Sequence, residues 1–267
     1  MQLLLFLGLG YLGVVGALYF GQTAILFPGA GMPSQRLEQP RRPERLVLPT
    51  GDGAEVHGML LRAPSEDADL LIGFGGNGQD AEHLAQDLGA DFPDLQVAVF
   101  HYRGYGPSTG KPGEAALLAD ALTIHDGLIE RLRPPRTFAV GISLGSAVAA
   151  YLSRQRPIAG LILITPFDSV EAIARQAYFW VPVGPLLRHR FPTIEFLAGN
   201  PTPVAVIAAE QDRVVRPERT RVLVESLPNL VFHRVLDGAS HNTLYQVPTY
   251  QQTLEAALAA IRAAADG

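Results

Sequence analysis

From residue 45 onward, short apolar runs alternate with stretches of helical periodicity. Several runs are continuous in Val, Ile, Leu, Ala and Phe, as is typical of strands that are covered on both faces in a parallel sheet. Eight strands are predicted, at residues 45–49, 55–62, 70–74, 96–102, 137–142, 160–164, 204–209 and 231–236.

Between these runs, apolar residues recur at steps of three and four, which predicts amphipathic helices packed on a sheet. The pattern is clearest in two series: Leu117, Ala121, Ile124, Leu128 and Leu132, and Tyr250, Leu254, Leu258 and Ile261. Alternating strands and helices favour an α/β fold with a doubly wound sheet. The first two strands have no helix between them and should pair antiparallel at one edge.

The segment 168–203 interrupts this alternation. It contains Trp180, the only tryptophan of the chain, beside Phe179. Prolines at 182, 185 and 192 exclude a single long helix. The segment could be a cap over a pocket or a helical excursion packed on its own domain, and the sequence leaves both open.

The beginning of the chain has a different character. Residues 3–20 contain no charged side chain, and the apolar pattern resumes after Gln22 and Thr23. A bilayer-spanning helix needs about 20 apolar residues. We therefore expect a retained single-pass membrane anchor, with a signal peptide or a buried helix as alternatives.

The chain is thus predicted to consist of an anchor at 1–27, a linker rich in Pro, Gly and Arg at 28–44, and one large α/β domain at 45–267 that contains the cap-like insertion at 168–203. Four arginines follow the apolar segment and none precedes it: Arg36, Arg41, Arg42 and Arg45. By the positive-inside rule, these arginines weakly favour the cytoplasmic side of the membrane for the domain.

Composition narrows the possible functions. The 267 residues carry a net charge of −5, and Lys and Arg are not concentrated into a phosphate-binding stripe, which argues against a nucleic-acid partner. The absence of cysteine excludes disulfides, thiol catalysis and cysteine-ligated metals.

The candidate chemistry begins at Gly141-Ile142-Ser143-Leu144-Gly145, where an apolar strand turns directly into a helix of small residues. A sharp turn of this kind exposes the serine hydroxyl at the carboxyl edge of the sheet, and the glycines permit close packing. The backbone N–H of Leu144, at the helix amino terminus, would face an oxyanion forming beside Ser143.

A nucleophilic serine needs a histidine base and a carboxylate that orients it. Asp212 follows the run VAVIAAE, and His241 follows the run VFHRVL, so both lie on loops after later strands. The order Ser, Asp, His is the one expected in this architecture. Glu210, Asp237 and Asp168 are competing carboxylates.

A second oxyanion donor is expected after the third strand, where the sequence reads Gly73-Phe74-Gly75-Gly76-Asn77-Gly78-Gln79. The N–H of Asn77 is the candidate. A nucleotide-phosphate loop fits poorly, because neither a Lys-Ser/Thr ending nor G-x-G-x-x-G spacing is present.

These motifs resemble the α/β-hydrolase superfamily, and within it the membrane-anchored serine hydrolases with a Tyr-Arg-Gly-Tyr-Gly motif. The stretches that carry the resemblance are Phe27-Pro28, YRGYGPS at 102–108, GKPGE at 110–114, VPVGPLLRHRFP at 181–192 and GASHN at 238–242. Gly75-Gly76 replaces the family's usual His-Gly, Gly113 stands where Ser is common, and Asp168 where an uncharged residue is expected.

The resemblance implies an α/β-hydrolase fold with a mostly parallel eight-stranded sheet, helices on both faces and a preceding membrane helix. It implies Ser143 as nucleophile, Asp212 as acid, His241 as base, and Asn77 and Leu144 as oxyanion donors. Tyr102, Phe179 and Trp180 are candidate substrate-pocket residues. No metal or cofactor is required.

The expected function is hydrolysis of an ester, thioester or related acyl bond, of a small-molecule or lipid-like substrate, through an acyl-enzyme. Two alternatives remain at this point. The same triad could serve a peptidase or an acyltransferase, since fold and triad leave the leaving group unspecified. The fold could also serve a non-catalytic membrane-anchored binding protein.

Overall fold

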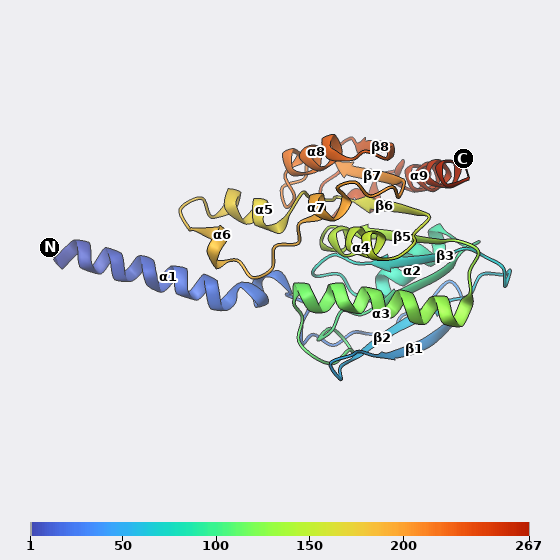
Figure 1. The fold of residues 1–267 in the computed structure, drawn as a ribbon, viewed down its shortest axis with the longest axis horizontal. Coiled ribbons are helices and arrows are strands. Elements are labelled where there is room, and N and C mark those ends of the chain that lie inside the picture. Colours follow the sequence, from blue (N-terminus) through green and yellow to red (C-terminus); the bar gives the residue numbers. More distant parts are fainter. Residues whose placement is uncertain (1, 267) are drawn as a thin grey trace.

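The structure, a computed structural model, describes residues 2–266. A long helix projects from a body in which one sheet lies between layers of helices (Figure 1). The sheet has eight strands in the order β1-β2-β4-β3-β5-β6-β7-β8. Their bounds are β1 Pro43–Pro49, β2 Glu55–Leu61, β3 Leu70–Phe74, β4 Gln96–Phe100, β5 Thr137–Ile142, β6 Gly160–Ile164, β7 Val204–Ala209 and β8 Leu230–Leu236.

All eight predicted strands are present, and four have the predicted ends. β1 and β2 pair antiparallel at one edge, as expected from the missing helix between them. β2 is also antiparallel to β4, and all remaining pairs are parallel. The central strands β3 to β7 are buried at every position, because helices cover both faces.

The helices of the body are α2 Ala81–Asp91, α3 Glu114–Leu132, α4 Leu144–Gln155, α8 Pro217–Ser226 and α9 Tyr250–Ala265, with a single 3₁₀ turn at Leu244–Gln246. α2 and α9 pack on one face of the sheet, and α3, α4 and α8 on the other. The stripes predicted from the sequence are the buried faces of α3 and α9.

The insertion between β6 and β7 forms three short helices, α5 Val170–Ala177, α6 Val183–Leu186 and α7 Thr193–Leu197. Pro182 and Pro192 directly precede α6 and α7, so the prolines break the segment as expected. α7 returns to the body and packs on α4, whereas α5 and α6 reach out towards the projecting helix (Figure 1).

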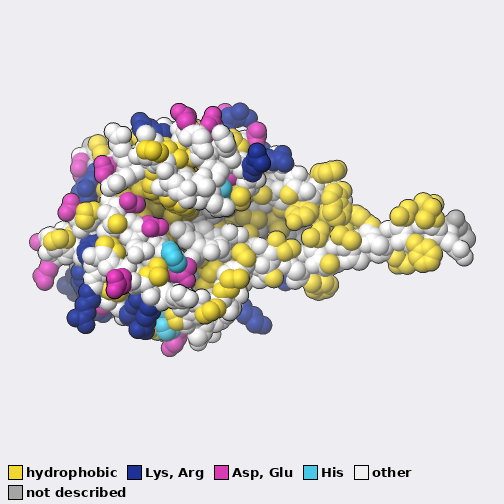
Figure 2. All heavy atoms as spheres, turned by 180° about the vertical axis from the view of Figure 1, so that it is seen from behind, with side chains coloured by type: hydrophobic (Ala, Val, Ile, Leu, Met, Phe, Trp, Pro, Cys, Tyr) yellow, Lys and Arg dark blue, Asp and Glu magenta, His cyan; other side chains and the backbone are white. Residues whose placement is uncertain are grey.

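The projecting helix is α1, Gln2–Leu26. Its 25 residues give a length of about 37 Å, compared with about 30 Å for the hydrocarbon core of a bilayer. None of its residues is buried, and the helix is long and apolar enough to cross a membrane. Figure 2 shows hydrophobic side chains crowded on this helix and where it meets the body, while charged side chains lie on the body.

Candidate active site

Ser143 occupies the turn between β5 and α4 with φ of 50°, a value that a non-glycine residue rarely adopts. The turn is fixed by a hydrogen bond of 2.9 Å from the Ser143 N–H to the Ile164 carbonyl. A Cβ on Gly145 would overlap the carbonyl oxygen of Phe74, so only glycine lets α4 begin this close to β3. The strain and the close approach together raise the hydroxyl above the carboxyl edge of the sheet.

His241 and Asp212 lie on the loops that follow β8 and β7, at the same edge of the sheet as Ser143; His241 contacts Ser143, and Asp212 contacts His241. The Nε2 atom of His241 is 3.1 Å from Oγ of Ser143, and its Nδ1 atom is 2.7 Å from Oδ2 of Asp212. The other carboxylate oxygen of Asp212 accepts N–H bonds from Val214 and Val215, at 2.9 and 2.8 Å. The carboxylate is therefore held in a fixed orientation towards the ring.

Two of the three competing carboxylates have other partners, and the third, Asp237, is exposed. Asp168 is buried and accepts a hydrogen bond of 3.0 Å from Arg219. Glu210 accepts the backbone N–H of Gly238 at 2.8 Å. Asp212 is the carboxylate that contacts the imidazole.

The glycine-rich loop after β3 lies beside this serine. A Cβ built on Gly76 would be 3.7 Å from the Cβ of Ser143. Two tyrosines hold the loop from behind: Tyr102 donates to the Gly75 carbonyl at 2.7 Å, and Tyr105 donates to the Asn77 carbonyl at 2.6 Å. Burial raises the pKa of both phenols well above the usual value, so they remain donors. The N–H of Leu144 lies at the start of α4, where helical N–H groups have no acceptor within the helix.

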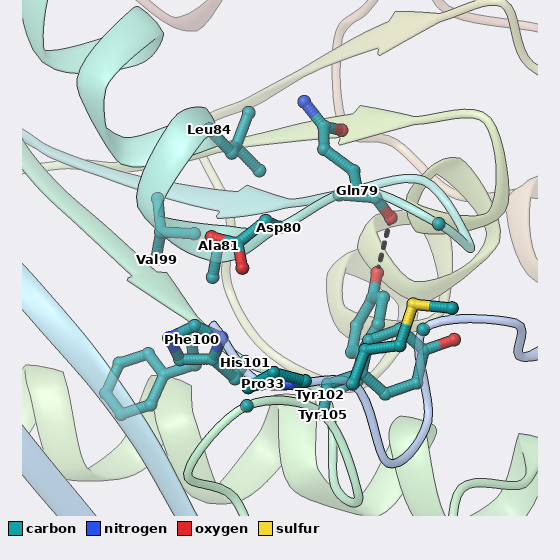
Figure 3. Close-up of a pocket in the computed structure, with 15 residues that line it drawn as sticks. Pro33, Gln79, Asp80, Ala81, Leu84, Val99, Phe100, His101, Tyr102 and Tyr105 are labelled. Atoms are coloured by element: carbon teal, nitrogen blue, oxygen red, sulfur yellow. Dashed lines mark hydrogen bonds between the residues drawn. The ribbon is translucent and has the colours of Figure 1, made fainter. Parts of the chain in front are cut away.

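A cavity of about 180 Å³ lies behind the glycine-rich loop, between the loop and the YRGYG segment. Figure 3 shows Tyr102 pointing across this cavity to the loop, with His101 at the far side. His101 is buried, and burial lowers the pKa of its imidazole. Tyr102 thus lies in the wall that supports the loop.

The other two candidate pocket residues lie at the tip of the insertion, far from this wall. Phe179 is 84% exposed and Trp180 is 43% exposed, in the connection between α5 and α6. The ring of Trp180 packs edge-on against Tyr11 of α1 at 6.1 Å, and Tyr11 donates a hydrogen bond to the Trp180 carbonyl.

Sequence reasoning did not find the contacts between α1 and the rest of this region. The Asn77 side chain donates to the carbonyl of Leu26, the last residue of α1, at 3.1 Å. Thr23 is hydrogen-bonded to His189 at 2.9 Å, and Gln22 bonds to the backbone of Leu186 and Arg188. The signal was present in the sequence, because Gln22 and Thr23 interrupt an otherwise apolar segment, where polar residues commonly have specific partners.

Comparison with known proteins identifies the family. The sequence model of the protein family with the α/β-hydrolase fold matches residues 70–192, which include the glycine-rich loop and Ser143. An uncharacterized protein of Mycobacterium tuberculosis is 32% identical over 236 residues, which cover 86% of this chain and 84% of the relative. The chain belongs to the α/β-hydrolase family.

Further comparisons agree with this assignment. Protein bem46 of Schizosaccharomyces pombe is 30% identical over 229 residues, covering 78% of this hydrolase and 76% of that protein. Among solved structures, the Pyrococcus furiosus esterase Pf2001 has a TM-score of 0.67 at 17% identity, covering 85% of this chain and 97% of the esterase. The likeness to that esterase establishes the shared fold.

Proposed function

We propose that this α/β-hydrolase is a membrane-anchored serine hydrolase that cleaves an ester, thioester or related acyl bond through an acyl-enzyme. The observation that carries the proposal is the continuous hydrogen-bonded series from Ser143 through His241 to Asp212, with distances of 3.1 and 2.7 Å. This arrangement has the order and orientation that nucleophilic catalysis by serine requires.

The proposed reaction begins when Oγ of Ser143 attacks the carbonyl carbon and its proton passes to Nε2 of His241. Asp212 keeps the proton of the imidazole on Nδ1 and stabilises the cation that forms. The bond to the leaving alcohol or thiol then breaks, and the leaving group takes the proton from Nε2. Water, activated in the same way, releases the acid and restores Ser143.

The tetrahedral oxyanion would be stabilised by the backbone N–H groups of Leu144 and Asn77. One such donor contributes about 2.7–4 kcal/mol to transition-state stabilisation in comparable sites. The positive end of the α4 dipole favours the same charge. The tyrosine bonds to the carbonyls of Gly75 and Asn77 support this assignment, because they fix the two peptide planes that flank the Gly76–Asn77 peptide. That peptide carries the Asn77 N–H, and its carbonyl accepts the N–H of Gln79 at 3.2 Å.

Membrane attachment is the second part of the proposal. α1 would cross the bilayer, and the positive-inside rule would hold the hydrolase domain on the cytoplasmic side. Two of the arginines behind that rule also have structural contacts: Arg41 donates to three backbone carbonyls, and Arg45 pairs with Glu82. Protease accessibility of the domain in sealed vesicles of known orientation would test the side.

The activity is tested with the full chain in detergent or vesicles, using p-nitrophenyl esters of increasing chain length and, in parallel, aminoacyl p-nitroanilides. Ester hydrolysis that is lost in Ser143→Ala supports the proposal. Cleavage of the anilides alone would identify a peptidase with the same triad. A folded protein that turns over neither class would contradict the proposal and favour the non-catalytic binding protein.

A further inference from the structure

A second cavity, of about 330 Å³, lies between α1 and the helices α5 and α6. One wall is a single face of α1, and the facing wall is the apolar side of α5 with the chain that follows it. The residues from α1 are Val15, Leu18, Tyr19, Gln22, Ile25 and Leu26. Those from α5 include Val170, Ile173, Ala174 and Ala177. We call this cavity the anchor groove.

One end of the anchor groove lies at the candidate oxyanion loop. Asn77 lines the groove and is hydrogen-bonded to Leu26 at the end of α1. Asn77 follows Gly76, which lies beside Ser143. An acyl chain in the groove would therefore have its carbonyl end at the loop that flanks Ser143.

The other end of the groove is at Val15, eleven residues before Leu26. Eleven helical residues advance about 16 Å. An extended chain advances about 1.2 Å for each bond of its backbone, so this distance corresponds to roughly 13 carbons. The groove thus has the length of a single long acyl chain.

With α1 inserted in a bilayer, its polar contacts would lie at a membrane boundary that crosses the groove. The exposed Arg188 donates to the Tyr19 carbonyl at 3.0 Å and lies over the Tyr19 ring, which marks a polar level. Residues 2–18, on the far side of that level, span about 26 Å, close to the hydrocarbon thickness of a bilayer. Val15 then lies in the hydrocarbon, whereas Leu26 and Asn77 lie above it.

The exposed tip of the insertion agrees with this placement. Trp180 contacts Tyr11, eight residues before Tyr19, which is about 12 Å deeper along α1. Phe179 and Trp180 are exposed aromatic side chains at that depth. They would be covered by lipid, so the deep end of the groove opens into the bilayer.

We infer that the anchor groove holds the acyl chain of a long-chain ester dissolved in the membrane leaflet, with α1 as one wall of the substrate site. The inference rests on the proposed serine hydrolase activity and on insertion of α1. To reach Ser143, a leaflet ester must rise past the headgroups, and each methylene exposed to water would disfavour that step by about fourfold. The apolar groove removes this exposure.

The test compares matched variants of the full chain in phosphatidylcholine vesicles. Val15→Trp fills the groove from α1, and Val14→Trp places the same side chain at the exposed neighbouring position. Ala177→Phe fills it from α5, with Gln176→Phe as the exposed control. The readout is the ratio of kcat/KM for p-nitrophenyl dodecanoate to that for the butyrate, and partitioning of each ester into the vesicles cancels between variants.

We expect both groove variants to lower the ratio at least tenfold and both controls to keep the wild-type ratio. Equal ratios in a groove variant and its control, with the wild type active on butyrate, would overturn the groove and leave the serine hydrolase proposal standing. An inactive wild type would overturn both. The rate of fluorophosphonate labelling of Ser143 checks that each variant has a folded site.

Discussion

The edge of the sheet and the anchor groove are built in opposite ways. At the edge, Ser143, Asp212 and their loops are held by backbone hydrogen bonds, and the two functional loops are joined by a bond of 2.8 Å from Gln211 to Ala239. Around the groove, neither α1 nor α5 has a buried residue. Atoms that must meet within tenths of an ångström lie on rigid elements, while the region that would select the substrate is held by few contacts.

The largest loss of activity is expected from a substitution at the rigid edge of the sheet. Ser143→Ala should lower kcat for ester hydrolysis by about 10⁶-fold. Ser143, His241 and Asp212 act together, and this substitution removes the nucleophile. Ser146→Ala is the matched control, three residues along the same helix. It removes one buried bond, of 3.0 Å to the Gly141 carbonyl, and should cost about 1 kcal/mol of stability with activity retained. Equal activity of the two variants would refute the assignment.

A second change tests the orientation of the imidazole. Asp212→Asn should lower kcat by about 10⁴-fold, since an amide no longer holds the proton on Nδ1. Asp168→Asn, in the loop after the neighbouring strand, should retain activity because Asp168 bonds to Arg219. Steady-state kinetics on p-nitrophenyl butyrate measures both. The reverse ranking would move the acid role to Asp168.

The sequence predicted the rigid edge far better than the groove. Continuous apolar runs identify strands such as β3 and β5 without reference to distant contacts. The order Ser143, Asp212, His241 follows the order of β5, β7 and β8, the strands that precede them. The hydrogen bonds between Gln22 of α1 and the backbone of Leu186 and Arg188, which we call the latch, join residues more than 160 positions apart. No local pattern in the sequence encodes such a contact. For the same reason, the sequence could not place Tyr102 behind the loop and Trp180 against Tyr11.

The latch gives a smaller expected effect. Gln22→Ala removes the bonds to the Leu186 carbonyl and the Arg188 N–H, at 3.2 and 2.7 Å. At about 1 kcal/mol for each bond, local opening of the insertion should increase about 30-fold. Trypsin cleavage after Arg188 should accelerate accordingly, and Gln176→Ala on the exposed side of α5 is the control. An unchanged cleavage rate would show that the latch does not hold the insertion.

The smallest effect concerns the body far from both regions. Burial, with Asp87 and Glu255 nearby, raises the pKa of Asp91 to about 6 from 3.8. A raised carboxyl pKa favours the folded state below the unfolded pKa, and that contribution is lost as the pH rises through 6. Asp91→Asn should therefore stabilise the protein by about 1 kcal/mol at pH 8, after allowance for solvent screening, and be neutral near pH 3.5. Thermal unfolding at the two pH values measures this difference, and a larger effect at low pH would contradict the sign.

If Ser143 is an activated nucleophile, a serine-reactive phosphonate should form a covalent bond with it. The full chain is treated with a fluorophosphonate, digested, and the modified residue is located by mass spectrometry. We expect one adduct on Ser143, with labelling abolished in Ser143→Ala and strongly slowed in His241→Ala. An unmodified Ser143 in folded protein, or labelling that is as fast without His241, would contradict this expectation.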